Sequence, residues 1–431
     1  MTIATSTPSL FDLYFDYVRD TEPPVIFHRW SLLSSLGALL GRQVWIPFGS
    51  FRIFPNQFVM LIAEPGARKS TAIKTARKLL SKAGHDKFAA EKTSKEKFLL
   101  DLEGVEESSD SQVSEKLVME NLLGSVLGSE PRESYIVADE FNDFMRCGDL
   151  EFHSMLGALW DWDDESTAYK QRLKNSRSVS IFQPTINLLG GNTHTNFAEM
   201  FPPAAIGQGF ISRLILVFSE PSGKKIAFPE PPSQEREQTL IRALQTIKAR
   251  MNGPMQLSGK AKEVLTVLYN TFDGLPDARL SSYSTRRYTH LMKLCILCAA
   301  ARLSMTIELE DVVLANTILS YTEHFMPKAL GEFGKAKNAD VQQMLLNYLT
   351  HNVSKGPIGL PDLYCQVSSN LDRQEDLVRI MAGLQTAGKV QYVTNKGTVS
   401  GGGYMIVRKM ISNQQLYVNM ELLKEFEHAR I

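Results

Sequence analysis

A lysine and a hydroxyl residue stand side by side near the end of the segment AEPGARKST, residues 63–71. In phosphate-binding loops of the pattern G-x-x-x-x-G-K-[ST], backbone amides wrap the phosphates, the lysine reaches the β and γ oxygens, and the hydroxyl holds Mg²⁺. Lys69 and Ser70 fill the last two positions, and Gly66 remains inside the loop. Two pattern glycines are missing, so the segment by itself fits an ordinary strand-turn-helix equally well.

The two missing glycines are replaced by Ala63 and Arg68. A side chain before the lysine costs conformational energy that glycine would avoid, although the Arg68 amide can still serve the loop if the backbone permits. We expect the Arg68 side chain to point outward or toward a phosphate. The residues predicted to contact a nucleotide are Gly66, Ala67, Arg68, Lys69, Ser70 and Thr71.

Acidic and amide side chains that such a loop requires occur further along the chain. The segment SYIVADE, residues 134–140, is an apolar run that ends in Asp139 and Glu140. Asp139 would hold Mg²⁺ together with Ser70, and Glu140 would activate the attacking water. A surface strand end is the alternative for this common pattern. The apolar segment PTINLLGGN then ends in Asn192, an amide that could sense the γ-phosphate or the water.

The elements that must position these residues alternate between strands and helices. QFVMLIA (57–63) reads as a strand, and TAIKTARKLLSKAG (71–84) has apolar residues at helical spacing. Short strands alternating with helices predict an α/β fold with a mostly parallel sheet covered on both faces. Because open α/β sheets bind ligands at the carboxyl ends of their strands, we expect the lysine, acids and amide to form one site for ATP and Mg²⁺.

Composition is that of an ordinary globular protein. The chain has 431 residues, 43% apolar and 22% charged, with a formal net charge of zero, which argues against a globally basic nucleic-acid coat. Cys295 and Cys298 lie in an apolar helical run and read as buried helix residues, not as a zinc site. Neither a signal peptide nor a long apolar segment is evident, so we expect a cytoplasmic protein without membrane contact.

Breaks in the pattern predict five segments. PEPPSQE (229–235) is a linker, and SGK at 258–260 provides an N-cap for a helix beyond it. Three helices and a terminal hairpin after residue 338 are typical of a winged helix. The predicted segments are a helical N-terminal element (1–42), a P-loop ATPase core (43–228), a helical lid (236–335), a winged helix (338–412) and a C-terminal helical tail (413–431).

The order of six motifs resembles a known family. These motifs are FHRWSLLSSLGALLGRQVWI, EPGARKS, VADE, LWDWDDESTAYKQRLKNS, INLLGGNT and GFISRLILVF, which together cover roughly residues 25–330. The chain resembles phage- and plasmid-encoded P-loop ATPases of the RecA/AAA+ type, related to the helicase portion of primase-helicases. The resemblance implies a P-loop NTPase sheet in a ring-forming replicative motor, usually hexameric, with ATP at subunit interfaces and single-stranded DNA through the centre.

The resemblance also implies roles for individual residues. Lys69, Glu140 and Asn192 would take part in hydrolysis, and Arg213 would be an arginine finger that reaches a neighbour's γ-phosphate. A strand-edge arginine paired to a local acid is the alternative for Arg213. The segment that begins RRYTHLMKL resembles the helical lid of AAA+ ATPases, where an arginine at a helix start touches nucleotide. Arg286 and Arg287 both fit, with Arg287 preferred.

A basic hairpin is the candidate DNA contact. The segment YKQRLKNSRS lies between the acidic strand and the strand that ends in Asn192, where ring helicases resembling this chain insert pore loops. Its basic side chains, suited to backbone phosphates, are Lys170, Arg172, Lys174 and Arg177. A solvated hairpin without a ligand is the alternative. The winged helix could bind DNA or a protein equally well, because acids accompany the arginines of its second long helix.

Two enzymatic functions remain open from the sequence, beside a non-enzymatic one in which the imperfect loop has lost hydrolysis. One is an ATP-dependent replicative DNA helicase of a phage or mobile element, moving along single-stranded or forked DNA as a homo-oligomer. The sequence has no recognisable primase domain, so a separate primase or other replication protein is an expected partner. The alternative is a regulatory ATPase, such as a helicase loader, replication initiator or defence switch, that assembles on ATP and recruits partners without unwinding.

Overall fold

The chain forms two compact units. The computed structural model describes residues 8–104, 130–163, 168–172, 178–201, 209–331, 339–352, 356–371, 373–386, 389–393, 402–406 and 417–428. Unit 1 contains residues 1–333 and 414–431, and unit 2 contains residues 334–413. None of the helices within these described ranges combines the length and apolar character that crossing a membrane requires.

A four-stranded parallel sheet is the centre of unit 1. Its strands, in their order across the sheet, are β4 (Glu133–Ala138), β7 (Thr185–Asn192), β3 (Phe58–Ile62) and β8 (Leu214–Phe218). Every residue of β3 and β7 is buried, as expected for central strands that are covered on both faces. The predicted α/β class with a parallel sheet is therefore confirmed. The carboxyl ends of all four strands meet at one edge, which we call the carboxyl edge.

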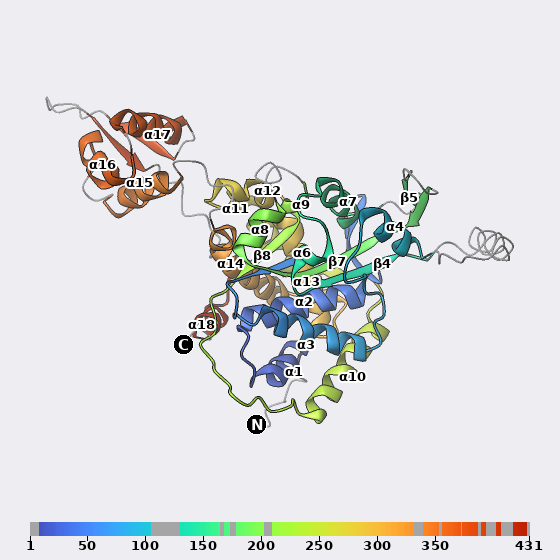
Figure 1. Ribbon diagram of the computed structural model, residues 1–431. Helices are drawn as coiled ribbons and strands as arrows, with labels where there is room; N and C mark the ends of the chain where they lie inside the picture. Colours follow the sequence, from blue (N-terminus) through green and yellow to red (C-terminus); the bar gives the residue numbers. More distant parts are fainter. Residues whose placement is uncertain are drawn as a thin grey trace, which may run out of the picture. The chain divides into compact units, whose positions relative to one another are not determined.

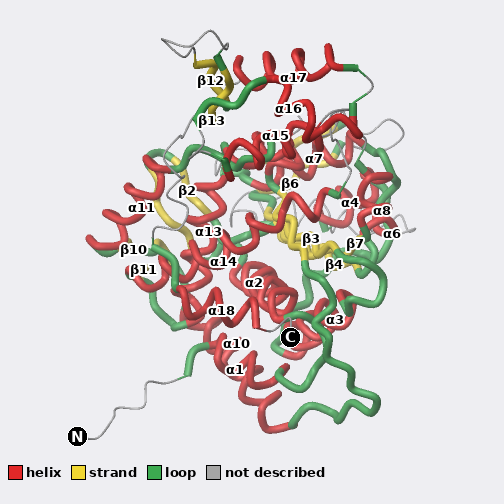
Figure 2. Tube along the Cα trace, turned by 90° about the vertical axis from the view of Figure 1, so that its left-hand side faces the viewer, coloured by secondary structure: helices red, strands yellow, loops and turns green. Residues whose placement is uncertain are grey.

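Two adjacent glycines of β7 show which helices cover which face of the sheet. Successive strand residues point to opposite faces, and a Cβ on Gly190 would meet Phe141 whereas a Cβ on Gly191 would meet Ile73. Helices therefore lie on both faces (Figures 1 and 2). They are α2 (Val25–Leu40) and α3 (Lys69–Lys82) on one face, and α6 (Phe141–Phe144), α7 (Leu150–Trp160) and α9 (Gly209–Ser212) on the other.

The N-terminal helices belong to the same core as the sheet, not to a separate element. All residues of α2 except Val25 are buried, because α2 packs between the sheet and other helices. α1 (Leu10–Val18) starts at Ser9 with a capping box, in which Ser9 and Asp12 exchange hydrogen bonds. The predicted boundary at residue 42 is therefore not a boundary between compact units.

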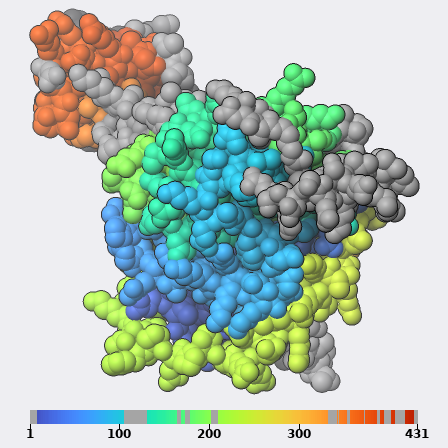
Figure 3. Space-filling model, turned by 45° about the vertical axis from the view of Figure 1, so that its right-hand side comes forward, coloured from blue at the N-terminus to red at the C-terminus, as the bar shows by residue number. Residues whose placement is uncertain are grey.

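Helix α10 (Gln234–Arg250) forms the start of the segment predicted to be the lid. It packs on α1, α2 and α3, and Glu237 accepts hydrogen bonds from Tyr17 (3.3 Å) and Lys82 (2.6 Å). In the space-filling view its yellow-green surface adjoins the blue surface of the N-terminal residues (Figure 3). The first helix after the linker thus belongs with the N-terminal helices, because its partners are distant in sequence and no local pattern specifies them.

The remaining helices of unit 1 surround this core. They are α4 (Lys95–Glu103), α8 (His194–Met200), α11 (Gly259–Thr271), α12 (Ser281–Ser284), α13 (Arg287–Ala301), α14 (Leu309–Leu330) and α18 (Met420–His428), with a short 3-10 helix at Ala278–Leu280. α14 covers β8, the edge strand of the sheet. Ser258 caps α11 as predicted, and Cys295 and Cys298 are buried in α13 as predicted.

Short strands complete unit 1. β1 (Val44–Phe48) pairs antiparallel with β2 (Phe51–Ile53) and parallel with β9 (Gly253–Pro254), and β10 (Gln256–Leu257) pairs with β11 (Thr306–Ile307). β5 (Ala168–Gln171) and β6 (Val179–Phe182) form the two arms of the predicted basic hairpin. From its apolar pattern the motif GFISRLILVF would be a strand throughout, but only its second part forms one, β8. Its first four residues form the helical turn α9, closed by the bond from the Ser212 hydroxyl to the Gly209 carbonyl (2.7 Å).

Unit 2 consists of helices followed by a β hairpin. They are α15 (Ala339–His351), α16 (Leu360–Val367), a 3-10 helix at Ser368–Asn370, α17 (Gln374–Thr386), β12 (Val390–Val393) and β13 (Gly403–Ile406). The strands are antiparallel, and Ile358 adds a bridge to Tyr404. After unit 2 the chain returns to unit 1, where the amide of Asn419 donates to the Thr317 hydroxyl of α14 (2.8 Å).

The close packing of β7 against the acidic segment yields a first prediction. An added methyl at Gly191 would collide with the backbone carbonyl of Asp139. We expect Gly191→Ala to lower the free energy of unfolding by about 2 kcal/mol, because backbone has to move. Gly259→Ala is the control, since open space surrounds that position at the start of α11. Urea denaturation that finds Gly191→Ala as stable as the wild type would refute the packing.

Candidate functional site

The segment AEPGARKST forms the turn between β3 and α3. β3 ends at Ile62 and α3 begins at Lys69, as the sequence predicts. Gly66 has φ 88°, and Arg68 adopts a left-handed conformation with φ 61° and ψ 26°. No side chain caps α3, so the amides of its first turn are left for another acceptor. An anion suits this position because the helix dipole is positive there.

The Arg68 side chain points away from the loop. Its guanidinium Nε donates to the Glu22 carboxylate, in the connection between α1 and α2. More than half of the Arg68 side chain is exposed. Of the two directions expected for Arg68, the structure shows the outward one. Among the other loop residues, Ala67 is buried and Thr71 is exposed on α3.

The Lys69 ammonium is held inside the loop by backbone oxygens. Its Nζ donates to the carbonyls of Ala63 (2.8 Å) and Glu64 (3.4 Å), and the residue is 5% exposed. Burial lowers the pKa of Lys69, while the nearby carboxylates of Glu140 and Glu64 oppose the shift. A buried cation with only neutral acceptors in contact would bind more strongly to a charged acceptor.

The two acids follow β4 and face the same loop. The ammonium of Lys74 on α3 lies 2.6 Å from the Asp139 carboxylate. Ser70 precedes Lys74 by four residues and therefore lies on the same side of α3. Carboxylate and hydroxyl oxygens are ligands that a hard cation such as Mg²⁺ accepts. Within the described ranges, no group of three or more His, Cys, Asp or Glu residues could hold a metal by itself.

Asn192 lies at the centre of the carboxyl edge and is fully buried. Ile62 pairs with Asn192 across the sheet, and the Ala63 amide donates to the Asn192 carbonyl (3.4 Å). The Asn192 side-chain amide donates to Asn142 (3.1 Å), and its oxygen accepts from the Thr193 amide (3.1 Å). Lys69, Asp139, Glu140 and Asn192 therefore come together at one edge, as the sequence predicts.

Two asparagines that lie at the carboxyl edge, Asn142 and Asn196, were not predicted from the sequence. Asn142 holds the Asn192 amide, and the Asn196 amide lies 3.5 Å from a carboxylate oxygen of Glu140. Asn142 also donates to the Asn196 carbonyl (3.3 Å), so both are part of one network. Asn142 follows Glu140 by two residues and Asn196 follows Asn192 by four, and this closeness in the sequence could have indicated that both belong to the site.

Arg213 lies at the opposite end of the sheet. It directly precedes β8, whose first residue, Leu214, pairs with Phe58 at the start of β3. Its guanidinium donates to the Gly209 carbonyl (2.7 Å) and to the Asp161 carboxylate (3.2 Å). Burial lowers the pKa of Arg213, and Asp161 opposes this shift. The pairing with a local acid is the alternative that the sequence left open.

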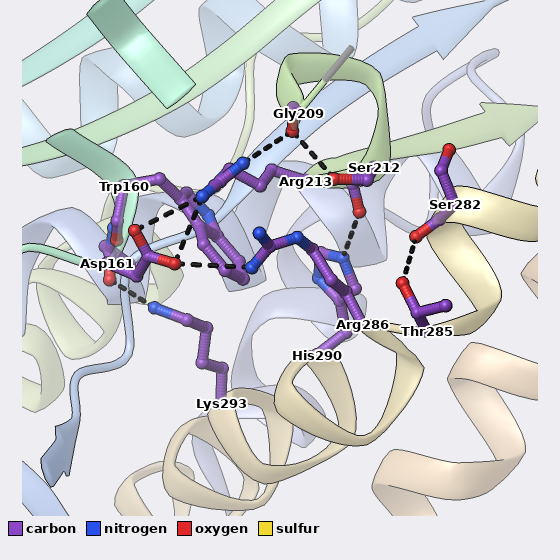
Figure 4. Close-up of polar contacts among 11 residues, drawn as sticks. Trp160, Asp161, Gly209, Ser212, Arg213, Ser282, Thr285, Arg286, His290 and Lys293 are labelled. Atoms are coloured by element: carbon purple, nitrogen blue, oxygen red, sulfur yellow. Dashed lines mark hydrogen bonds and ion pairs between the residues drawn. The ribbon is translucent and has the colours of Figure 1, made fainter. Parts of the chain in front are cut away.

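A cluster of polar side chains surrounds Arg213 at the amino ends of the strands, which we call the amino edge (Figure 4). Arg286 shares the Asp161 carboxylate with Arg213, at 3.3 Å. The buried ammonium of Lys293 donates to the Phe54 carbonyl (2.9 Å) and lies 4.3 Å from the centre of the Trp160 ring. Burial lowers the pKa of Lys293 to about 7. Two guanidiniums on one carboxylate leave the cluster with an excess of positive charge.

Arg287 does not join the candidate site. It is buried in α13, where its Nε lies 2.8 Å from Glu323 and its Nη2 donates to Asn316 (2.9 Å). Both partners are on α14, so the guanidinium ties two helices together. Arg287 is buried and already paired with Glu323 and Asn316. This arrangement therefore does not support the preference for Arg287 over Arg286 as a nucleotide contact.

The basic hairpin is only partly described. Lys170 lies in β5 opposite Ser180 of β6, and Arg172 follows β5; both are exposed. Lys174 and Arg177 lie outside the described residues. The antiparallel arms agree with the predicted hairpin, and the expected DNA contact stays a prediction.

No protein-family model matches the chain, and the comparison with curated proteins finds no matching sequence. The chemistry of the site is therefore inferred from its own residues.

The left-handed conformation of Arg68 yields a second prediction. Arg68→Gly and Arg68→Ala both lose the contact with Glu22, but only glycine relieves the strain of positive φ. We expect Arg68→Gly to be more stable than Arg68→Ala by about 1 kcal/mol in chemical denaturation. Equal stabilities would contradict a left-handed residue at this position.

The buried pair of Arg287 and Glu323 yields a third prediction. Arg287→Ala leaves the Glu323 carboxylate buried without its cation, and we expect a loss of about 3 kcal/mol in the free energy of unfolding. Arg286→Ala, at the more exposed neighbouring position, should cost less than about 1 kcal/mol. An Arg287→Ala protein of normal stability that binds ATP poorly would instead support a nucleotide contact.

Proposed function

We propose that the protein binds and hydrolyses ATP with Mg²⁺, as a P-loop NTPase with the fold of that class. The observation that carries this proposal is the convergence of Lys69, Asp139, Glu140 and Asn192 at the carboxyl edge. A helix start with uncapped amides, a buried ammonium and two acids in the same place suit a triphosphate with its metal. An ordinary strand-turn-helix would need neither the buried ammonium nor the two acids.

Each side chain has a role that follows from its position. Lys69 would exchange two backbone carbonyls for the β and γ oxygens, next to the α3 amides. Mg²⁺, held by Ser70, Asp139 and water, would neutralise charge on the phosphates. Glu140 would accept the proton of the water that attacks the γ-phosphorus, as the bond to the β-phosphate oxygen breaks. Asn192, fixed by Asn142, would orient the water or the γ-phosphate.

Assembly into a ring is the next step of the proposal. Arg213 lies at the amino edge, away from the nucleotide site of its own chain, which suits a finger that acts on a neighbour. It would have to leave Asp161 for the γ-phosphate of that neighbour. The expected assembly is a homo-oligomer, most simply a hexamer, with ATP between subunits.

The function that this site supports best is a DNA-translocating motor, a replicative helicase of a phage or mobile element. The exposed basic arms with Lys170 and Arg172 suit phosphate contacts on a single strand. Unit 2, with its helices followed by a hairpin, is proposed to be a winged helix. A separate primase or other replication protein would be its partner at a fork.

One observation favours the second candidate, a regulatory ATPase that does not unwind. Helix α17 carries Glu375 and Asp376 in its first turn, where acids oppose contact with DNA phosphates. A protein partner fits such a helix better. The protein would then be a loader, initiator or switch that assembles on ATP and recruits its partner through unit 2.

Hydrolysis and unwinding assays form the fourth prediction. We expect Lys69→Ala to abolish ATP binding and Glu140→Gln to retain binding while lowering hydrolysis at least about 100-fold, since proton acceptance is lost. Lys74→Ala is the matched lysine control on α3 and should still bind ATP. Wild-type protein without ATP hydrolysis, or Glu140→Gln with full activity, would refute the site.

A forked duplex separates the two candidates. A helicase should displace the strand in an ATP-dependent reaction that Lys69→Ala and Lys174→Ala both lose. Hydrolysis and ATP-dependent assembly without displacement, with mass photometry reporting the assembly, would favour the regulatory ATPase.

A further inference from the structure

A single histidine connects the phosphate loop to the end of helix α14. His194 is the first residue of α8 and follows Asn192 by two positions. Its Nδ1 lies 3.0 Å from the Glu64 carboxylate, and its Nε2 lies 2.9 Å from the Lys328 carbonyl. Glu64 is in the loop before α3, and Lys328 is in the last turn of α14. None of the roles assigned to residues of the candidate site involves His194.

Both partners of His194 can only accept hydrogen bonds. A carboxylate oxygen and a backbone carbonyl have no proton to donate, so a ring nitrogen that bonds to either of them is the donor. The charged groups around it are Glu64 and the Lys328 ammonium, which lies 3.3 Å from Glu220.

Packing keeps the ring in this place. Its centre lies 5.6 Å from that of the Phe218 ring, and a Cβ on Gly331 would lie only 3.3 Å from the His194 ring. Gly331 ends α14 with φ 51°. Arg279 donates to the neighbouring carbonyls of Gly331 (2.9 Å) and Pro327 (3.4 Å). The His194 and Arg279 side chains therefore both contact the last turn of α14, and His194 also reaches the loop.

Charge makes the loop contact sensitive to a bound triphosphate. The Glu64 backbone carbonyl accepts from Lys69 (3.4 Å), and the Glu64 carboxylate acts on the same ammonium. A triphosphate in the loop would draw Lys69 away and place negative charge beside that carboxylate. Like charges repel, so the contact of Glu64 with His194 is the one that a nucleotide would weaken.

Helix α14 precedes unit 2 in the chain and contacts residues that follow unit 2. The chain passes from α14 into unit 2, and after unit 2 it returns to α14 through Asn419 and Thr317. The Tyr321 hydroxyl of α14 also donates to the Phe426 carbonyl of α18 (3.2 Å). Helix α14 is therefore in contact with the chain that follows unit 2.

We propose that His194 is a positioning residue that couples occupancy of the phosphate loop to the last turn of α14. This inference rests on the proposed function, because it requires a triphosphate in the loop. With the loop empty, His194 bridges Glu64 and Lys328. With ATP bound, Glu64 is released from the ring and the last turn of α14 loosens.

Hydrogen exchange of full-length protein, with and without saturating Mg-ATP, tests the coupling in residues 326–331, and an ATP titration of each variant establishes saturation. In the wild type we expect ATP to accelerate exchange there about tenfold, the effect of losing one hydrogen bond. His194→Ala should exchange rapidly with and without ATP. Glu64→Gln, which removes the repelling charge at an exposed position, should keep the slow exchange and lose the response.

His324→Ala is the matched control, an exposed histidine of the same helix α14, and it should respond like the wild type. Slow exchange in His194→Ala, or a full ATP response in Glu64→Gln, overturns the coupling. Wild-type protein that binds ATP without any change in residues 326–331 overturns it as well, and leaves the proposed ATPase intact. Wild-type protein that binds no ATP refutes the proposed function and the coupling together.

Discussion

The position of β7 between β3 and β4 is the constraint on which the candidate site depends. Ile62 pairs with Asn192 on one side of β7, and Ala138 pairs with Gly190 on the other. A slip of one residue would turn every side chain of β7 to the other face. It would also move Gly191 from the position where the backbone of Asp139 approaches it. Register and close packing therefore set the distance between the loop and the acids.

The charged side chains at the two edges of the sheet have different kinds of partner. At the carboxyl edge, the Lys69 ammonium is in contact with neutral carbonyls only, so a phosphate would be a stronger acceptor. At the amino edge, Arg213 and Arg286 already share the Asp161 carboxylate. The cations at the amino edge therefore already have a carboxylate partner, whereas the Lys69 ammonium at the carboxyl edge has none in hydrogen-bond contact.

Helix α14 contacts several parts of unit 1. It covers the edge strand β8, holds Arg287 through Glu323, and carries the contacts of α18 after the chain returns from unit 2. Its last turn accepts hydrogen bonds from His194 and Arg279. The proposed coupling of the loop to the last turn of α14 needs only one of these contacts to change, because the rest of the helix is fixed by burial in the core.

The sequence by itself determined the α/β class, the strand-turn-helix around Lys69, and the acids and amide at strand ends. These follow from local apolar periodicity and from the rule that parallel strands end at one edge. Only the tertiary structure decided which arginines are satisfied internally, where α10 packs, and that His194 meets both Glu64 and Lys328. Such contacts join residues far apart in the chain, and no local pattern specifies which long-range partner a side chain will have.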